Sequence, residues 1–279
     1  MTRRYPEFIA RLKPAETSEL VQAMGKAKRE LLALGIEESL VNANIQNDID
    51  DVYERKSVKC AYEQDRFRRI LWRTYGEEAE DISWVTYGNP CYREPAGKVL
   101  RVRPANVLRH FSDLGTILRV QGYSPRGCAI FEHNVILALD EDPWVEPHYH
   151  GLVFGVPVEV VREAGRVNVP GAVTARRRPF HAAVVKTADD LANCIDYLTK
   201  FRPVGHPQYR DESGNLPTGK ERRLPKEIQR PLEEFLLLRP ISSLLTSLRD
   251  ELRPARLPLT MEMMPARFGM PNSPIRGRR

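Results

Sequence analysis

Apolar residues recur at helical spacing in the first part of the chain. One apolar stripe begins at Thr17 and stops near Gly35, and a second runs from about Cys60 to Tyr75. Apolar positions three and four residues apart are typical of amphipathic helices. The pattern therefore predicts a helical N-terminal extension over residues 1–78, in which we identify no chemistry.

The pattern changes after residue 81, where short β-rich runs bounded by Gly, Pro, Asn and Asp alternate with helical stretches. The predicted order is strand, helix, strand, strand, strand, helix. It favours an α+β fold with a central, mostly antiparallel sheet and helices packed on one face. Strands are predicted at 82–87, 128–139, 148–154 and 180–185, and helices at 104–120 and 187–201.

The same pattern divides the chain into regions. Residues 79–205 form the predicted core domain, and 206–252 form a C-terminal helical region that Pro240 interrupts. Residues 253–279 are rich in Pro, Met and Arg without periodicity, so we expect a disordered basic tail.

Composition excludes some classes of protein. No apolar run approaches the roughly 20 residues needed to span a bilayer, and the N-terminus lacks the apolar core of a signal peptide. We therefore expect a cytoplasmic protein without a membrane partner. The 4 cysteines are widely scattered, which predicts free thiols rather than a zinc site. The net charge of +6 favours a polyanionic partner only modestly, with Arg176, Arg177 and Arg178 as candidate phosphate contacts.

His148 and His150 are the first candidates for chemistry. Side chains alternate along a strand, so two histidines one residue apart point to the same face and can reach one metal ion. Two solvent-facing histidines on an edge strand are the alternative.

A third ligand is expected on the preceding strand. A turn centred on residues 140–143 would place His133 roughly opposite His150, whereas Glu132 would face the metal if the strand carried a bulge. A carboxylate suits Mg²⁺ or Mn²⁺ better than a third imidazole does. Glu132 and His133 therefore stay open, and Asp140 is a weaker candidate because it lies in the turn.

Tyr197 and Lys200 are the second candidates. They are three residues apart, so on one helix they share a face. A tyrosine oxygen can attack a phosphodiester, and a nearby lysine can stabilise the phosphate charge. The alternative is a tyrosine packed on the sheet beside a solvated lysine.

In combination and in this order, the motifs resemble those of the HUH endonuclease superfamily. A hydrophobic strand ends near a threonine, a His-hydrophobic-His strand follows, and a helix then carries Tyr-x-x-Lys. In this chain the motifs are Trp84-Val85-Thr86, Pro147-His148-Tyr149-His150 and Tyr197-Leu198-Thr199-Lys200, within residues 81 to 203.

The resemblance implies a ferredoxin- or RRM-like nuclease core and a function. The motif order and the single tyrosine are similar to those of plasmid and small-virus rolling-circle replication initiators. Such an enzyme nicks and rejoins single-stranded or hairpin origin DNA through a covalent 5′-phosphotyrosine. It uses Mg²⁺ or Mn²⁺ held by His148, His150 and the third ligand, with Tyr197 and Lys200 catalytic.

The chain contains no Gly-x-x-x-x-Gly-Lys-Ser/Thr loop, so the resemblance implies a host helicase and polymerase as partners. The alternatives are a transposase or mobilisation relaxase of the same chemistry, or a non-catalytic nucleic-acid-binding module. The sequence does not give the oligomeric state.

Overall fold

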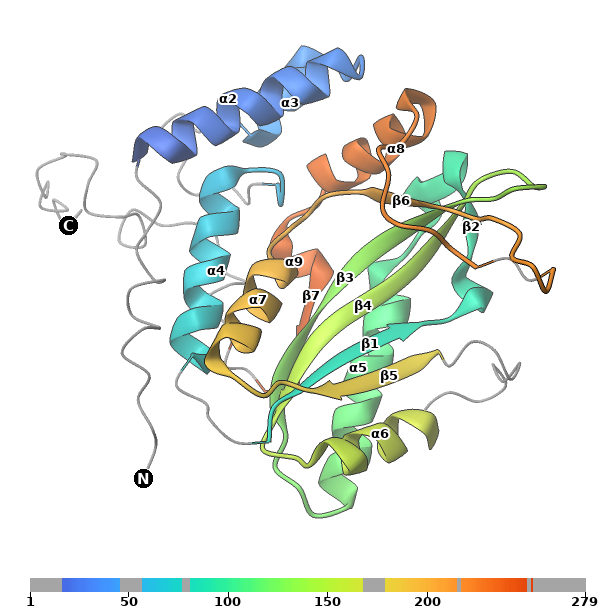
Figure 1. The fold of residues 1–279 in the computed structure, drawn as a ribbon. Helices are drawn as coiled ribbons and strands as arrows, with labels where there is room; N and C mark the ends of the chain where they lie inside the picture. Colours follow the sequence, from blue (N-terminus) through green and yellow to red (C-terminus); the bar gives the residue numbers. More distant parts are fainter. Residues whose placement is uncertain are drawn as a thin grey trace, which may run out of the picture.

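A seven-stranded sheet lies at the centre of the computed structural model, which describes residues 17–45, 57–76, 81–167, 179–214, 217–249 and 252 (Figure 1). The path of neighbouring strands is β5-β1-β4-β3-β6, while β2 pairs with β4 and β7 with β3. Every pairing is antiparallel except that of β3 with β6. The strands are β1 (Ser83–Gly88), β2 (Glu94–Pro95), β3 (Arg126–Leu137), β4 (Trp144–Phe154), β5 (Phe180–Val184), β6 (Val204–Pro207) and β7 (Leu245–Ser247).

Helices surround this sheet, so the prediction of an α+β fold with a mostly antiparallel sheet is confirmed. The α-helices are α2 (Thr17–Ala33), α3 (Glu38–Ile45), α4 (Ala61–Tyr75), α5 (Pro104–Val120), α6 (Val158–Val167), α7 (Ala188–Leu198), α8 (Lys226–Leu237) and α9 (Ile241–Leu244). Two 3₁₀ segments, η2 (Pro90–Tyr92) and η3 (Ala96–Arg101), precede α5.

The helices cover both faces of the sheet, and the expectation of a single covered face was wrong. Tyr149 of β4 contacts Phe111 of α5, whereas Trp84 of β1 contacts Tyr197 of α7 on the opposite face. Figure 1 shows α7 in front of the sheet and α5 behind it. The reason is that most side chains of β3 and β4 are buried on both faces of the sheet, and a strand with two apolar faces must be covered on both.

Helices α2 and α4 lie over the two stretches of the N-terminal region that have apolar residues at helical spacing. Helix α4 packs into the same core as the sheet, with Tyr75 stacked on Phe154 of β4 at a centroid distance of 4.6 Å. Helices α2 and α3 form a smaller apolar cluster with Leu237 of α8. None of the described helices is long and apolar enough to cross a membrane.

Several elements differ from the sequence expectation. Helix α6 lies between the predicted strands 148–154 and 180–185, where no helix was predicted, and the C-terminal region contributes β7 to the sheet as well as helices. Thr187 and Asp190 form a capping box at the start of α7, where a helix was predicted to begin, but the helix ends at Leu198 rather than near residue 201. The cysteines are free, as predicted. The tail 253–279 lies outside the described residues.

The Tyr75–Phe154 stack provides a test of how strongly α4 is integrated. Phe154→Ala removes a fully buried ring and leaves a cavity, so we expect the free energy of unfolding to fall by about 3–5 kcal/mol. Urea denaturation monitored by circular dichroism measures this loss. Val120→Ala is the control, because that side chain is 83% exposed and its removal should change stability by less than about 0.5 kcal/mol. A loss as small for Phe154→Ala would contradict a shared core.

Candidate metal centre and tyrosine pocket

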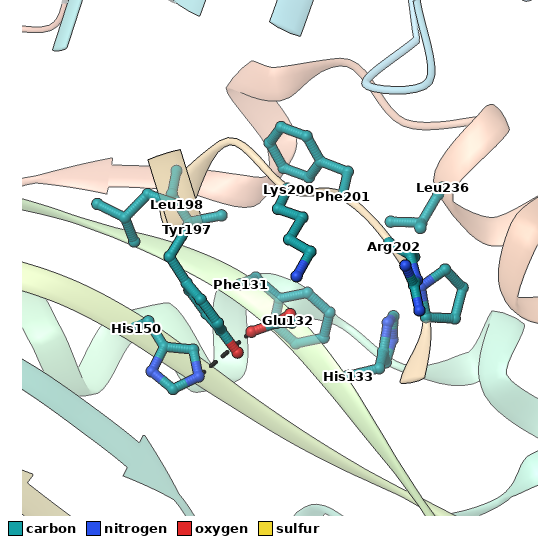
Figure 2. Close-up of a pocket in the computed structure, with 12 residues that line it drawn as sticks. Phe131, Glu132, His133, His150, Tyr197, Leu198, Lys200, Phe201, Arg202 and Leu236 are labelled. Atoms are coloured by element: carbon teal, nitrogen blue, oxygen red, sulfur yellow. Dashed lines mark ion pairs between the residues drawn. The ribbon is translucent and has the colours of Figure 1, made fainter. Parts of the chain in front are cut away.

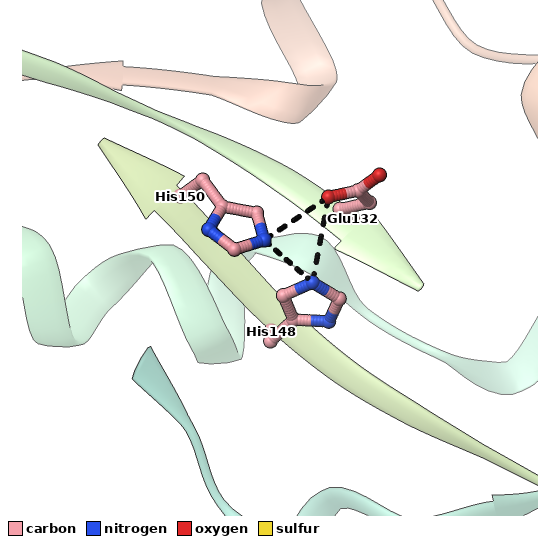
Figure 3. Close-up of side chains that lie close together, drawn as sticks. All are labelled: Glu132, His148 and His150. Atoms are coloured by element: carbon pink, nitrogen blue, oxygen red, sulfur yellow. Dashed lines mark hydrogen bonds and ion pairs between the residues drawn. The ribbon is translucent and has the colours of Figure 1, made fainter. Parts of the chain in front are cut away.

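The pairing of β3 with β4 brings three potential metal ligands to one face of the sheet. Glu132 lies directly opposite His148, and Ile130 lies opposite His150. Partners in an antiparallel pair share a face, as do residues two apart on one strand. Glu132, His148 and His150 therefore project together, and Figure 3 shows their side chains converging.

The ligand atoms of these residues form a nearly equilateral triangle. The Nε2 atoms of the two histidines are 3.1 Å apart. The Oε2 atom of Glu132 lies 3.4 Å from Nε2 of His148 and 3.2 Å from Nε2 of His150. Donors bound at about 2.0–2.2 Å to one ion lie roughly 3 Å from each other. The triangle thus has the dimensions of one face of a metal coordination shell.

Hydrogen bonds on the far side of each ring orient these ligand atoms. The Nδ1 atom of His148 lies 3.1 Å from the backbone carbonyl oxygen of Glu146, which can only accept, so Nδ1 donates; in a neutral ring this leaves the lone pair on Nε2. The Nδ1 atom of His150 lies 2.9 Å from the hydroxyl of Thr86, the residue paired with it on β1. Both contacts hold the orientation of a ring, and the carbonyl oxygen also fixes the position of a proton on Nδ1 of His148, as is typical of metal-ligating histidines.

The electrostatics of the triad favour an anionic carboxylate beside the two imidazole rings. Burial alone would raise the pKa of Glu132, but hydrogen bonds and charges of His148 and His150 outweigh it and lower the pKa to about 2. Burial is the main cause that lowers the pKa of His150. A carboxylate with two imidazole lone pairs is a donor set that binds a divalent cation.

The structure brings Glu132, and not His133, to the histidines. Our expectation that His133 lies opposite His150 was wrong: His133 pairs with Pro147, and no bulge is needed to bring Glu132 onto the histidine face. The hairpin pairs Ile136 with Trp144, so its turn is centred closer to Glu132 than we assumed.

His133 points to the other side of its strand, into an apolar setting. Its ring packs edge-on against Phe131 and Phe235, and its Nε2 atom is buried without a hydrogen-bond partner. Burial lowers its pKa to about 3, so the ring is neutral. Asp140, the other alternative, is exposed in the turn and forms an ion pair with Arg210.

Tyr197 lies beside the triad. Its ring meets His150 edge-on at a centroid distance of 5.0 Å and Trp84 at 5.7 Å, and Figure 2 shows its phenol oxygen beside the carboxylate of Glu132. Burial first, and then the charge of Glu132, raise the pKa of the phenol. The tyrosine is therefore packed on the histidine face while its oxygen reaches the potential ligands.

Lys200 lines the same pocket, although it is not on the helix of Tyr197 as predicted. Helix α7 ends at Leu198, and the backbone N–H of Lys200 donates to the carbonyl oxygen of Tyr197 in the turn that follows. Figure 2 shows the amine of Lys200 directed into the pocket between Tyr197 and Phe131. Glu132 and His150 belong to the lining as well.

A gap along one edge of β3 makes room for this pocket. On that edge β7 pairs with residues 128–130 and β6 with residues 134–137, and no strand of the described chain pairs with residues 131–133 between them. The segment 200–203, which connects α7 to β6, lines the pocket there together with Leu236 of α8. The site is thus open at the edge of the sheet.

The remaining residues are the three candidate arginines and the groups that orient the histidine rings. Arg176, Arg177 and Arg178 lie outside the described residues. The ring-orienting roles of Thr86 and of the Glu146 carbonyl were not found from the sequence, although Thr86 had been noted at the end of its strand. Only the register of β1 against β4 shows that Thr86 faces His150.

No family model, curated protein or solved structure matches this chain.

Titration with Mn²⁺ tests the identity of the third ligand. We expect the wild-type protein to bind one ion and Glu132→Ala to lose at least tenfold in affinity, because a charged donor is removed. His133→Leu is the matched control, since it changes the adjacent residue on the opposite face and should leave affinity within about twofold. Isothermal titration calorimetry measures both. The reverse pattern would assign the site to His133.

Thr86 gives a test of the orienting hydrogen bond. Thr86→Val keeps the shape but removes the hydroxyl, and we expect a loss of about 10–100-fold in Mn²⁺ affinity because the ring of His150 is no longer held. Thr86→Ser retains the hydroxyl and should restore most of the affinity. Equal affinities for the Val and Ser variants would show that this contact does not support the metal centre.

Proposed function

We propose that this protein nicks and rejoins single-stranded DNA, with Tyr197 as the nucleophile, in the manner of the rolling-circle replication initiators of the HUH superfamily. The observation that carries the proposal is that the phenol oxygen of Tyr197 lies beside the carboxylate of Glu132, one of three potential metal ligands (Figure 2). A nucleophile beside an electrophile-binding site is the arrangement that covalent phosphoryl transfer requires.

The donor set fits a divalent cation. Two imidazoles and one carboxylate suit Mn²⁺, and Mg²⁺ is a harder ion that prefers oxygen ligands. Such an ion, held by Glu132, His148 and His150, would supply Lewis-acid neutralisation of the charge on the oxygens of a bound phosphodiester. The fit rests on the triangle of ligand atoms and on the contacts that hold the two rings.

The side chains of the chain account for the transfer itself. The phenol oxygen of Tyr197 attacks the phosphorus and forms an O–P bond, while the bond from phosphorus to the 3′ oxygen breaks. The phenol proton passes to water, and the leaving 3′ oxygen takes a proton from water. The product is a 5′-phosphotyrosine and a free 3′-hydroxyl, which a host polymerase would extend after a host helicase opens the duplex.

Lys200 stabilises the charge on the phosphate, and the phosphotyrosine bond can be reversed. The Lys200 amine, directed into the pocket, balances charge on the phosphate. Attack by a DNA 3′-hydroxyl on the phosphotyrosine restores the phenol and rejoins the strand. No external energy source is needed, because one phosphodiester bond is exchanged for another.

A covalent-adduct assay tests the proposal. We expect the protein with Mn²⁺ and a pool of randomised single-stranded oligonucleotides, labelled at their 3′ ends, to give a labelled band on denaturing gels. The label must be at the 3′ end because the fragment on the 3′ side of the break stays attached to the protein through its 5′ phosphate. Tyr197→Phe and EDTA should each reduce the band at least 100-fold.

The matched control is Tyr209→Phe, a tyrosine that is 52% exposed and lies outside the pocket lining. It should form the adduct at the wild-type level. An adduct that persists in Tyr197→Phe would place the nucleophile elsewhere, and the absence of any adduct from protein that binds Mn²⁺ would reject the nicking reaction.

A further inference from the structure

A groove lined by basic side chains adjoins the tyrosine pocket. It encloses about 1500 Å³ including open solvent, compared with about 400 Å³ for the pocket. Helix α2 and the start of α8 contribute to its walls, together with the segments 200–203 and 222–224. Its exposed cationic side chains are Lys26, Lys200, Arg202, Arg222, Arg223 and Lys226.

The charge of this groove is largely uncompensated. Its acidic side chains are Glu30 and Glu233. Glu233 pairs with Lys59 at 2.8 Å, and Glu30 lies 4.0 Å from Lys26. Within the described part of the chain, Lys200, Arg202, Arg222 and Arg223 form no ion pair. Unpaired arginines on one surface are suited to phosphate oxygens.

The groove and the pocket share one wall. Residues Lys200 to Pro203 line both cavities. Lys59 holds this segment in place. Its amine donates to the carbonyl oxygen of Phe201 at 3.3 Å and also pairs with Glu233 of α8. A chain that leaves the pocket across this segment therefore enters the groove directly.

We infer that this groove binds the phosphate backbone of the DNA strand next to the cleaved bond. The inference rests on the proposed function for the identity of the strand. A phosphodiester reaches Tyr197 only when its nucleotide is unpaired, and the groove continues from that point, so its occupant is single-stranded. Helix α2 then serves as a wall of the DNA site, and its packing against α4 gives the N-terminal region a role.

Binding measured without metal separates this inference from the nicking reaction. Fluorescence anisotropy in EDTA reports the affinity for a fluorescent oligothymidylate long enough to fill both cavities. For Arg222→Gln/Arg223→Gln we expect at least a tenfold loss of affinity. The slope of log K against log salt should fall by about 1.4, because each phosphate contact on a single strand contributes about 0.7.

The matched control removes the same charge on the other side of the sheet. Arg109 of α5 and Arg166 of α6 are exposed, and both helices pack on the face opposite the histidines. Arg109→Gln/Arg166→Gln should retain affinity within about twofold. Thermal melting checks that both double variants are folded, which we expect because all four side chains are exposed.

The possible outcomes are distinct. Equal losses in the two double variants would mean that net charge alone attracts DNA, and no loss at Arg222 and Arg223 would mean that the groove is not used; either result overturns the inference. Tighter binding of duplex than of single strand would also overturn it. Groove-dependent binding without any tyrosine adduct would reject the nicking reaction while supporting the groove as a single-strand site.

Discussion

The pairing of β3 with β4 runs without a bulge from Arg126 opposite Phe154 to Ile136 opposite Trp144, and the candidate site depends on that register. Because side chains alternate with a period of two, a slip by one residue would turn Glu132 away from the histidines and bring His133 to their face. The apolar residues on both faces of these strands oppose such a slip, since it would exchange the two sets of buried contacts. The fold thus specifies the ligand set through packing rather than through the ligands themselves.

The same register also supplies the contacts that hold the ligands. Antiparallel pairing of β1 with β4 places Thr86 against His150, while the carbonyl of Glu146 fixes His148 from its own strand. Bringing two imidazoles and a carboxylate together under partial burial is costly unless their remaining polar atoms are satisfied. These hydrogen bonds satisfy the outer nitrogen atoms of both rings and so offset part of the free-energy cost of burial. The ligand atoms are therefore oriented without an ion, which is what a preorganised centre means.

Sequence patterns predicted the parts of this site that depend on local periodicity. His148 and His150 follow from alternation on one strand, and the start of α7 follows from its capping box. To assign Glu132 as the third ligand, one must know the centre of the turn between β3 and β4. A run of Asp, Glu and Pro does not define that centre to within one residue. Helix α6 is not among the predicted helices although Val158, Val161 and Gly165 are buried at helical spacing, because a stretch so rich in polar residues is also typical of a connection. The pairing of β7 with β3 depends on tertiary contacts that three residues cannot signal.

The end of α7 at Leu198 connects the metal centre to the basic groove. Had the helix continued to residue 201, Lys200 would project from it one turn beyond Tyr197, and the chain would not turn toward β6 at this point. Instead the segment 200–203 crosses the unpaired edge of β3, where it lines the pocket on one side and the groove on the other. Lys59, which pairs with Glu233 of α8, holds this crossing in place by donating to the carbonyl oxygen of Phe201. A short helix and a gap between two edge strands therefore position Tyr197, the potential metal ligands and the basic groove side by side.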